Sequence, residues 1–183
     1  MFDFLGPFHP QIVHTPVALL IFSAFFAILG HLMDRDWLKK TAVVLLVFGF
    51  VGSYLAEQSG KPAHRVPERE QGVPEDAINE HSDAAKWVTW TSGGALLALG
   101  LATRVKGGVR TAVTGLALLL QVMAAVAVGR TALLGGKLTY DHGANVKVDG
   151  QLVKSARPSA EHHEGAMPGG THMDSAGARP HRH

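Results

Sequence analysis

The stretch HPQIVHTPVALLIFSAFFAILGHLM, residues 9–33, decides the fold class because it contains no Asp, Glu, Lys or Arg. A helix needs about 20 apolar residues to cross a hydrocarbon core of roughly 30 Å, so this run alone predicts a transmembrane helix. Pro10 and Pro16 lie near its start, where the first turn of a helix accepts proline. The run is too long for the apolar region of a signal peptide and no basic residue precedes it, so we expect no cleavage.

Three more charge-free runs follow along the chain, at residues 41–56, 87–103 and 111–129. The last is long enough to span a membrane, and flanking lysines can extend the two shorter runs because their stems lie along apolar surface. Inside lipid each segment must satisfy its own backbone polar groups, which favours helices. The sequence therefore predicts an all-α integral membrane protein, an antiparallel four-helix bundle with spans at about 11–33, 39–57, 86–104 and 110–134.

Composition supports this class and excludes others. Hydrophobic residues make up 46% of the 183 residues and charged residues only 17%, whereas soluble domains carry about 25% charge. A disordered chain, a coiled coil and an ordinary soluble enzyme are therefore excluded. The chain has no cysteine, which excludes disulfides, zinc fingers and cysteine-ligated iron–sulfur clusters. The net charge is only +2 and no basic stripe with interleaved aromatic residues occurs, so we expect no nucleic-acid partner.

Basic residues predict the orientation in the membrane. The short connections at 34–40 and 104–110 are basic, whereas the longer loop at 57–86 holds more acidic than basic residues. The positive-inside rule then places the two short connections in the cytoplasm. Both termini and the loop at 57–86 would face outward, into the periplasm where the cell has one.

Polar segments divide the chain further. We expect a transmembrane domain at 1–136 with an acidic outward loop at 57–86, in which Pro74 and the two acids after it predict a helix start that could run into the third span. Residues 137–154 predict a small hairpin outside the membrane, with Asp149 and Gly150 as its turn. Residues 155–183 are rich in Gly, Pro, Ser, Ala and His, which predicts an extended tail.

Histidines gather at one end of the predicted bundle. Of the six before the tail, five fall on the outward side, from separate segments of the chain: His9, His14, His64, His81 and His142. Imidazole is the commonest metal ligand and suits iron, zinc and copper. A b-type haem needs two axial imidazoles on facing helices and an apolar slot. We expect His14 and His81 to be the axial ligands, with His142 and then His9 as further candidates.

Arg130 is a candidate partner for a haem propionate. It lies in the last turns of the fourth span, where a charge is costly and needs a counter-charge, which Glu57 could also provide. Single histidines are more often structural than ligating. The alternative for His9 and His64 is therefore a solvated interfacial position, and the alternative for His81 is an exposed helix face.

The tail holds a second set of candidate ligands. Histidine together with methionine is typical of soft-metal sites, copper above all. Ordering a tail around a metal costs conformational entropy, so a tail that binds no metal is the alternative. The candidates are His162, His163 and His172, with Met167 and Met173 beside them.

Two motifs resemble a known family. HPQIVHTPVALL at 9–20 and GGKLTYDHGANV at 135–146 are similar to the opening and closing motifs of small four-span bacterial membrane proteins, catalogued as domain of unknown function 2231. HSDAA at 81–85 is similar to a third mark of that family. The resemblance extends over about 5–147 and implies that four histidines match the recurring histidines of the family: His9, His14, His81 and His142. The family's usual residues are replaced at Thr15, Thr139 and Ala144.

The resemblance also bears on function, because relatives are fused to Rieske or c-type cytochrome domains, which implies membrane electron transfer. We therefore expect a b-type haem-binding electron-transfer subunit of a larger respiratory or photosynthetic complex in a bacterial inner membrane. Its partners would be lipid, other subunits and a cytochrome c or Rieske-type protein, and it would not be an enzyme with its own substrate. Two alternatives stay open: a cofactor-free structural accessory subunit, and a membrane protein that handles copper or zinc.

Overall fold

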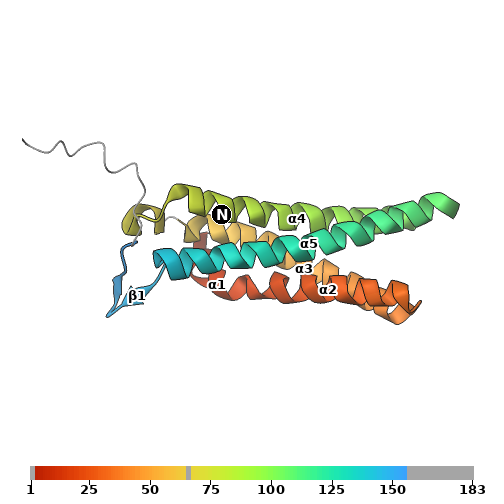
Figure 1. Cartoon of the computed structure of the whole chain (residues 1–183), viewed down its shortest axis with the longest axis horizontal. Helices are drawn as coiled ribbons and strands as arrows, with labels where there is room; N and C mark the ends of the chain where they lie inside the picture. Colours follow the sequence, from red (N-terminus) through yellow and green to blue (C-terminus); the bar gives the residue numbers. More distant parts are fainter. Residues whose placement is uncertain (1–2, 65–66, 156–183) are drawn as a thin grey trace, which may run out of the picture.

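The computed structural model describes residues 3–64 and 67–155 and is helical apart from one small hairpin. Four long helices run antiparallel, side by side (Figure 1): α2 (His14–Leu32), α3 (Asp36–Ala63), α4 (Glu75–Ala102) and α5 (Gly107–His142). Helices α2 and α4 each pack against both α3 and α5, which closes the four helices into a ring. The predicted all-α membrane-type fold is confirmed.

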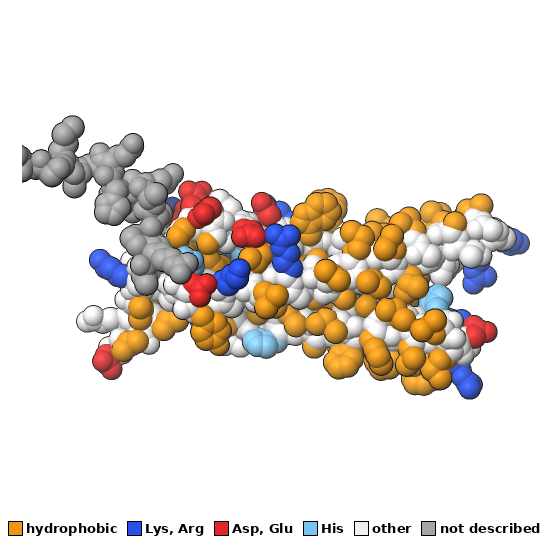
Figure 2. Space-filling view, in the orientation of Figure 1, with side chains coloured by type: hydrophobic (Ala, Val, Ile, Leu, Met, Phe, Trp, Pro, Cys, Tyr) orange, Lys and Arg blue, Asp and Glu red, His pale blue; other side chains and the backbone are white. Residues whose placement is uncertain are grey.

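Among the residues that the structure describes, three stretches are long and apolar enough to cross a membrane: Phe4–Leu32, Asp36–Gln71 and Gly107–His142. Large hydrophobic side chains lie exposed along the middle of the bundle, with charged side chains gathered towards its two ends (Figure 2). Phe48, for example, is 60% exposed and Leu97 is 78% exposed. Soluble monomers rarely expose apolar surface on this scale, so the belt is a lipid-facing surface.

Helix α4 is less apolar than the other three long helices. Its predicted span, residues 86–104, is interrupted by Lys86 and by threonine, serine and glycine residues, and α4 is not among the helices that meet the hydropathy and length of a span. It nevertheless packs inside the ring against α3 and α5. The four-span count therefore stays a prediction.

The predicted outward loop is much shorter than expected. Helix α3 continues past its apolar run to Ala63, and α4 begins at Glu75, immediately after Pro74, as the sequence predicts. What connects them is a short segment that contains one π-helical turn, η2 (Pro67–Gln71). Most of residues 57–86 are thus helical, because α3 and α4 extend beyond their apolar runs as turns with water-exposed polar faces.

Short elements complete the histidine-rich end of the bundle. The 3₁₀ helix η1 (Asp3–Phe8) and the single-turn helix α1 (His9–Ile12) precede α2 and pack against α3. Strands β1 (Lys147–Val148) and β2 (Gln151–Leu152) form an antiparallel hairpin. Asp149 and Gly150 have φ values of 52° and 79°, the backbone that a two-residue hairpin turn requires.

Gln71 fastens the C-terminal segment to this end of the molecule. Its side chain is buried, its Nε2 donates to the carbonyls of Gly143 and Val153, and its Oε1 accepts from the amide of Asn145 at 2.7 Å. The backbone amide of Ser155 donates to the Gln71 carbonyl at 2.8 Å. One residue of the η2 turn therefore holds residues 143–155 over the end of the bundle.

The bundle has an apolar core that is crossed by a series of buried hydrogen bonds. Leu20, Leu46, Val88, Ala95 and Val128 form the main buried cluster, to which all four long helices contribute. Elsewhere in the interior the Gln121 amide of α5 donates to Ser23 Oγ of α2, which donates to the Ala42 carbonyl of α3 at 2.9 Å. These hydrogen bonds satisfy groups that would otherwise be costly to bury, and they tie three helices together.

Candidate metal centre

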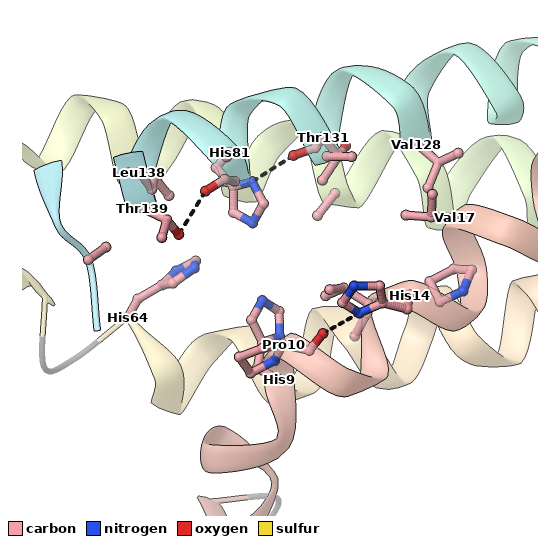
Figure 3. Close-up of a pocket in the computed structure, with 18 of the residues that line it drawn as sticks. His9, Pro10, His14, Val17, His64, His81, Val128, Thr131, Leu138 and Thr139 are labelled. Atoms are coloured by element: carbon pink, nitrogen blue, oxygen red, sulfur yellow. Dashed lines mark hydrogen bonds between the residues drawn. The ribbon is translucent and has the colours of Figure 1, made fainter. Parts of the chain in front are cut away.

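Three histidines meet at the end of the bundle opposite the α2–α3 turn. One ring nitrogen each of His9, His64 and His81 lies within 4.8 Å of the other two. The rings point toward one another from α1, from the end of α3 and from α4 (Figure 3). Ring centroids are 6.1 Å apart for His9 and His64 and 5.7 Å apart for His64 and His81, in edge-to-face arrangements. We call these residues the histidine trio.

Hydrogen bonds fix the proton on Nδ1 in two members of the trio. His81 Nδ1 lies 3.1 Å from the Thr131 carbonyl, which can only accept, so this nitrogen is the donor. His9 Nδ1 lies 2.8 Å from Ser59 Oγ, whose own hydrogen is already donated to the Ala56 carbonyl at 2.9 Å. Ser59 therefore accepts from His9. In both imidazoles Nε2 keeps its lone pair and is the atom able to bind a metal.

His64 also has a hydrogen-bond partner on Nδ1, a hydroxyl that can donate or accept. Its Nδ1 lies 3.3 Å from Ser82 Oγ of α4. Each member of the trio thus has a hydrogen-bond partner on Nδ1. Metal-ligating histidines almost always carry such a bond on the second nitrogen, because it orients the ring and sets the tautomer.

Two glycines make room for the rings. A Cβ atom on Gly60 of α3 would lie 3.3 Å from His9 Cε1, and one on Gly135 of α5 would lie 3.1 Å from His81 Cε1. Both contacts are tighter than ordinary packing allows, so each glycine lets a helix backbone approach an imidazole closely. Gly135 is the first glycine of the motif GGKLTYDHGANV.

Burial favours the neutral form of His81. His81 is only 8% exposed, and this burial lowers its pKa below the ordinary value for histidine. A lowered pKa keeps the imidazole uncharged near neutral pH, which is the form that binds a metal. His9 and His64 are half-buried.

The trio borders a cavity of about 560 Å³. Residues of α1, α2, α3, α4 and α5 line the cavity, and its mostly apolar walls include Val17, Val88 and Val128. His14 also lines it, facing His81 across the gap (Figure 3). His14 Nδ1 donates to the Pro10 carbonyl at 2.6 Å, so Nε2 is again the nitrogen with a lone pair.

Comparison with models of protein families assigns the chain to a family. The family model described as a predicted membrane protein (DUF2231) matches residues 6–148, which include the trio and the residues that line the cavity. The chain belongs to the DUF2231 family. No curated protein and no solved structure matches it.

Of the four histidines that resemble the recurring residues of DUF2231, only two fall in the trio, His9 and His81. His14 lines the same cavity. His142 does neither: its Nδ1 lies 3.3 Å from Ser155 Oγ, beside the cap that Gln71 holds. His31 lies at the opposite end of the bundle, with Nδ1 bonded to the Ala27 carbonyl at 2.8 Å.

The acidic partner of Arg130 is not Glu57, and its role toward a haem propionate stays a prediction. Its guanidinium lies 3.0 Å from a carboxylate oxygen of Glu80, rather than bonding to Glu57. Both side chains are more than half exposed, and Arg130 lines a second pocket with Trp87 instead of the histidine cavity. The tail candidates His162, His163 and His172 lie outside the described residues.

The sequence did not indicate His64 as a candidate ligand. This residue matches no motif, and a solvated position was the alternative reading of it. The sequence predicts that His64 lies at the same end of the bundle as His9 and His81, but its place in the trio depends on α3 running seven residues beyond the charge-free run, to Ala63. That extension brings His64 beside Ser82 and His81.

Proposed function

We propose that this DUF2231 protein binds one transition-metal ion, zinc or copper, through the Nε2 atoms of the histidine trio. The observation that carries the proposal is the convergence of three ring nitrogens within 4.8 Å. The Nδ1 bonds of all three rings support it, because they already orient the second nitrogen of each. The protein would then be a metal-handling membrane protein, the second alternative from the sequence.

The donor set suits these ions. Neutral imidazole is a good ligand for zinc and copper, and the trio contains no carboxylate to favour magnesium or calcium. Zinc binds imidazole nitrogen at about 2.0–2.1 Å, which places the nitrogens of a tetrahedral site roughly 3.3 Å apart. Small rotations of the side chains would bring the trio to that separation. A fourth position would remain for a ligand that the protein does not provide.

A b-type haem is a second candidate, supported by the position of His14 and His81 on facing walls of one cavity. Two members of the trio cannot serve as the axial pair while the third keeps its place. A third nitrogen within 4.8 Å of both would lie beside the iron, in the plane that the macrocycle occupies. Haem binding would therefore require His14. It would make the protein the electron-transfer subunit expected from its sequence, with partner subunits that include a redox protein.

The orientation of the protein in the membrane is part of the same proposal. The bundle end opposite the trio carries the basic connections at 34–40 and 104–110, which the positive-inside rule assigns to the cytoplasm. In a bacterial inner membrane the trio would then face the periplasm, with both termini on that side.

Metal counting tests the proposal. The full chain is purified in detergent with an affinity tag that contains no histidine, loaded with Zn²⁺ or Cu²⁺, freed of excess ion, and analysed by mass spectrometry of the metal. We expect His9→Ala, His64→Ala and His81→Ala each to bind about one ion fewer per chain than the wild type. Ions on the tail histidines are common to all variants and cancel in the difference.

His31→Ala is the matched control. His31 also donates Nδ1 to a carbonyl of its own helix, but it lies at the other end of the bundle. The count should stay at the wild-type value in His31→Ala and in His14→Ala. Equal counts in the wild type and all three trio variants would contradict the metal proposal. A pyridine haemochrome with a b-type band that disappears in His14→Ala would favour haem instead.

A further inference from the structure

The cavity beside the trio points to a ligand for the open metal position, and this inference rests on the proposed metal site. We propose that the metal binds the polar head of a single-chain amphiphile, which enters from the membrane between α2 and α5 and lays its chain in the cavity.

The opening lies between two helices that are candidate spans. Apart from Asn145, which follows α5, the exposed residues that line the cavity come from the α1–α2 side and from α5: Pro10, His14, Ala132, Thr139 and Tyr140. The stretches Phe4–Leu32 and Gly107–His142, to which these residues belong, both have the length and hydropathy of a membrane span. The gap lies near the ends of these two stretches, so it opens at the level of the lipid headgroups, from which the hydrocarbon chain of an amphiphile can enter.

The walls of the cavity offer the hydrocarbon chain of an amphiphile almost no polar contacts. Valine, alanine and proline are the commonest apolar residues of the lining. Its serine and threonine hydroxyls are already engaged within their own helices: Ser53 donates to the Phe50 carbonyl at 2.8 Å, Thr131 to Ala127 at 2.8 Å and Thr139 to Gly135 at 3.3 Å. The remaining hydroxyl, that of Tyr140, belongs to a side chain at the rim that is 90% exposed. A ligand deep in this cavity therefore finds polar partners mainly at the imidazoles.

The metal would lie where that apolar space ends. All three members of the trio border the cavity, so a coordination position that the protein leaves open can be reached from it. Three histidines with one open position is the arrangement of metal sites that exchange a water for a substrate or another ligand. The volume, about 560 Å³, falls within the range of small-molecule sites, roughly 300–1,000 Å³. An amphiphile with one ligating atom fits this arrangement, because its head can bind the metal while its hydrocarbon chain occupies the apolar cavity.

The test uses two probes with the same ligating nitrogen, 1-methylimidazole and 1-octylimidazole. The full chain is loaded with Co²⁺, whose visible absorption changes when a fourth ligand binds, and each probe is titrated in detergent. Burial of a methylene contributes about 0.8 kcal/mol, or roughly fourfold in affinity. We therefore expect the octyl probe to bind at least a hundredfold more tightly than the methyl probe.

Paired variants separate cavity binding from partition into the micelle. Ala132→Phe fills the rim of the cavity, whereas Leu133→Phe places the same ring on the outer surface of α5, where Leu133 is 73% exposed. Ala132→Phe should weaken the octyl probe at least tenfold and leave the methyl probe within about twofold of the wild type. Leu133→Phe should change neither.

Each other outcome overturns the inference. If Co²⁺ and the methyl probe bind but the octyl probe gains nothing, or gains equally in Ala132→Phe, the amphiphile proposal is wrong and the metal site stands. If Co²⁺ does not bind to the trio, the proposed function fails and this inference fails with it.

Discussion

Gly135 and Gly136 are neighbours in one motif, but only the first meets a histidine. A Cβ atom at Gly135 would lie 3.1 Å from His81 Cε1, whereas a Cβ atom at Gly136 would meet nothing within 4 Å. Both lie inside α5, where alanine is intrinsically more favourable than glycine by roughly 1 kcal/mol. Alanine substitutions at the two positions therefore distinguish the loss of space around the His81 ring from a change in the stability of the helix.

At the residue scale, this contrast gives a prediction. Gly135→Ala should lower metal affinity about tenfold, because the added methyl group displaces the His81 ring from the position that the Thr131 carbonyl sets, and the outer contacts of a ligand typically change affinity by 10–100-fold. Gly136→Ala should bind metal like the wild type. Competition with a chelator of known affinity measures both, and thermal unfolding should show that neither variant is less stable. Equal affinities would remove Gly135 from the site.

At the element scale, the η2 turn and the C-terminal hairpin form one unit through Gln71. Gln71→Ala removes the partner of two part-buried carbonyls and one amide, and a fully buried group left unsatisfied costs roughly 1–3 kcal/mol. We expect hydrogen exchange in residues 143–155 to accelerate at least tenfold, while the middle of α5 keeps its protection. Gln151→Ala, an exposed position in β2, is the control and should leave exchange unchanged. Unchanged exchange in Gln71→Ala would show that the segment is held by other contacts.

The same elements show how far the sequence could lead. Charge-free runs locate the helices because lipid excludes charge, and Asp149–Gly150 locates the hairpin because few residues accept positive φ. Hydropathy does not detect the ends of α3 and α5, since helix turns outside the membrane carry polar side chains on their exposed faces. His64 lies on such an end. For the same reason, Arg130 could not be paired with Glu80 before the start of α4 was placed against α5.

At the scale of the whole molecule, the number of spans decides which surfaces share a side of the membrane. The chain has no cysteine, so single cysteines can be labelled without background. Asp36→Cys and Thr103→Cys lie at the basic end of the bundle and leave its lysines and arginines intact, and Glu70→Cys and Gln151→Cys lie at the other end. If all four helices span, a membrane-impermeant maleimide added to intact cells should label Glu70→Cys and Gln151→Cys and should spare Asp36→Cys and Thr103→Cys until the cells are opened.

A different labelling pattern would change the topology. Labelling of Thr103→Cys together with Glu70→Cys would place both ends of α4 on one side, and α4 would then be a helix that does not cross. Labelling of Asp36→Cys alone in intact cells would reverse the orientation.

The length of α2 has a consequence for how the metal would be supplied. Its 19 residues rise about 28 Å, close to the roughly 30 Å of a hydrocarbon core. Because α2 begins at His14, the preceding turn with His9 lies past the edge of the hydrocarbon, among the lipid headgroups. An anionic leaflet with a surface potential of about −30 mV concentrates a divalent cation roughly tenfold in that layer. The trio would therefore fill at a lower bulk metal concentration in acidic lipid than in zwitterionic lipid, so that the composition of the membrane sets the effective affinity of the site.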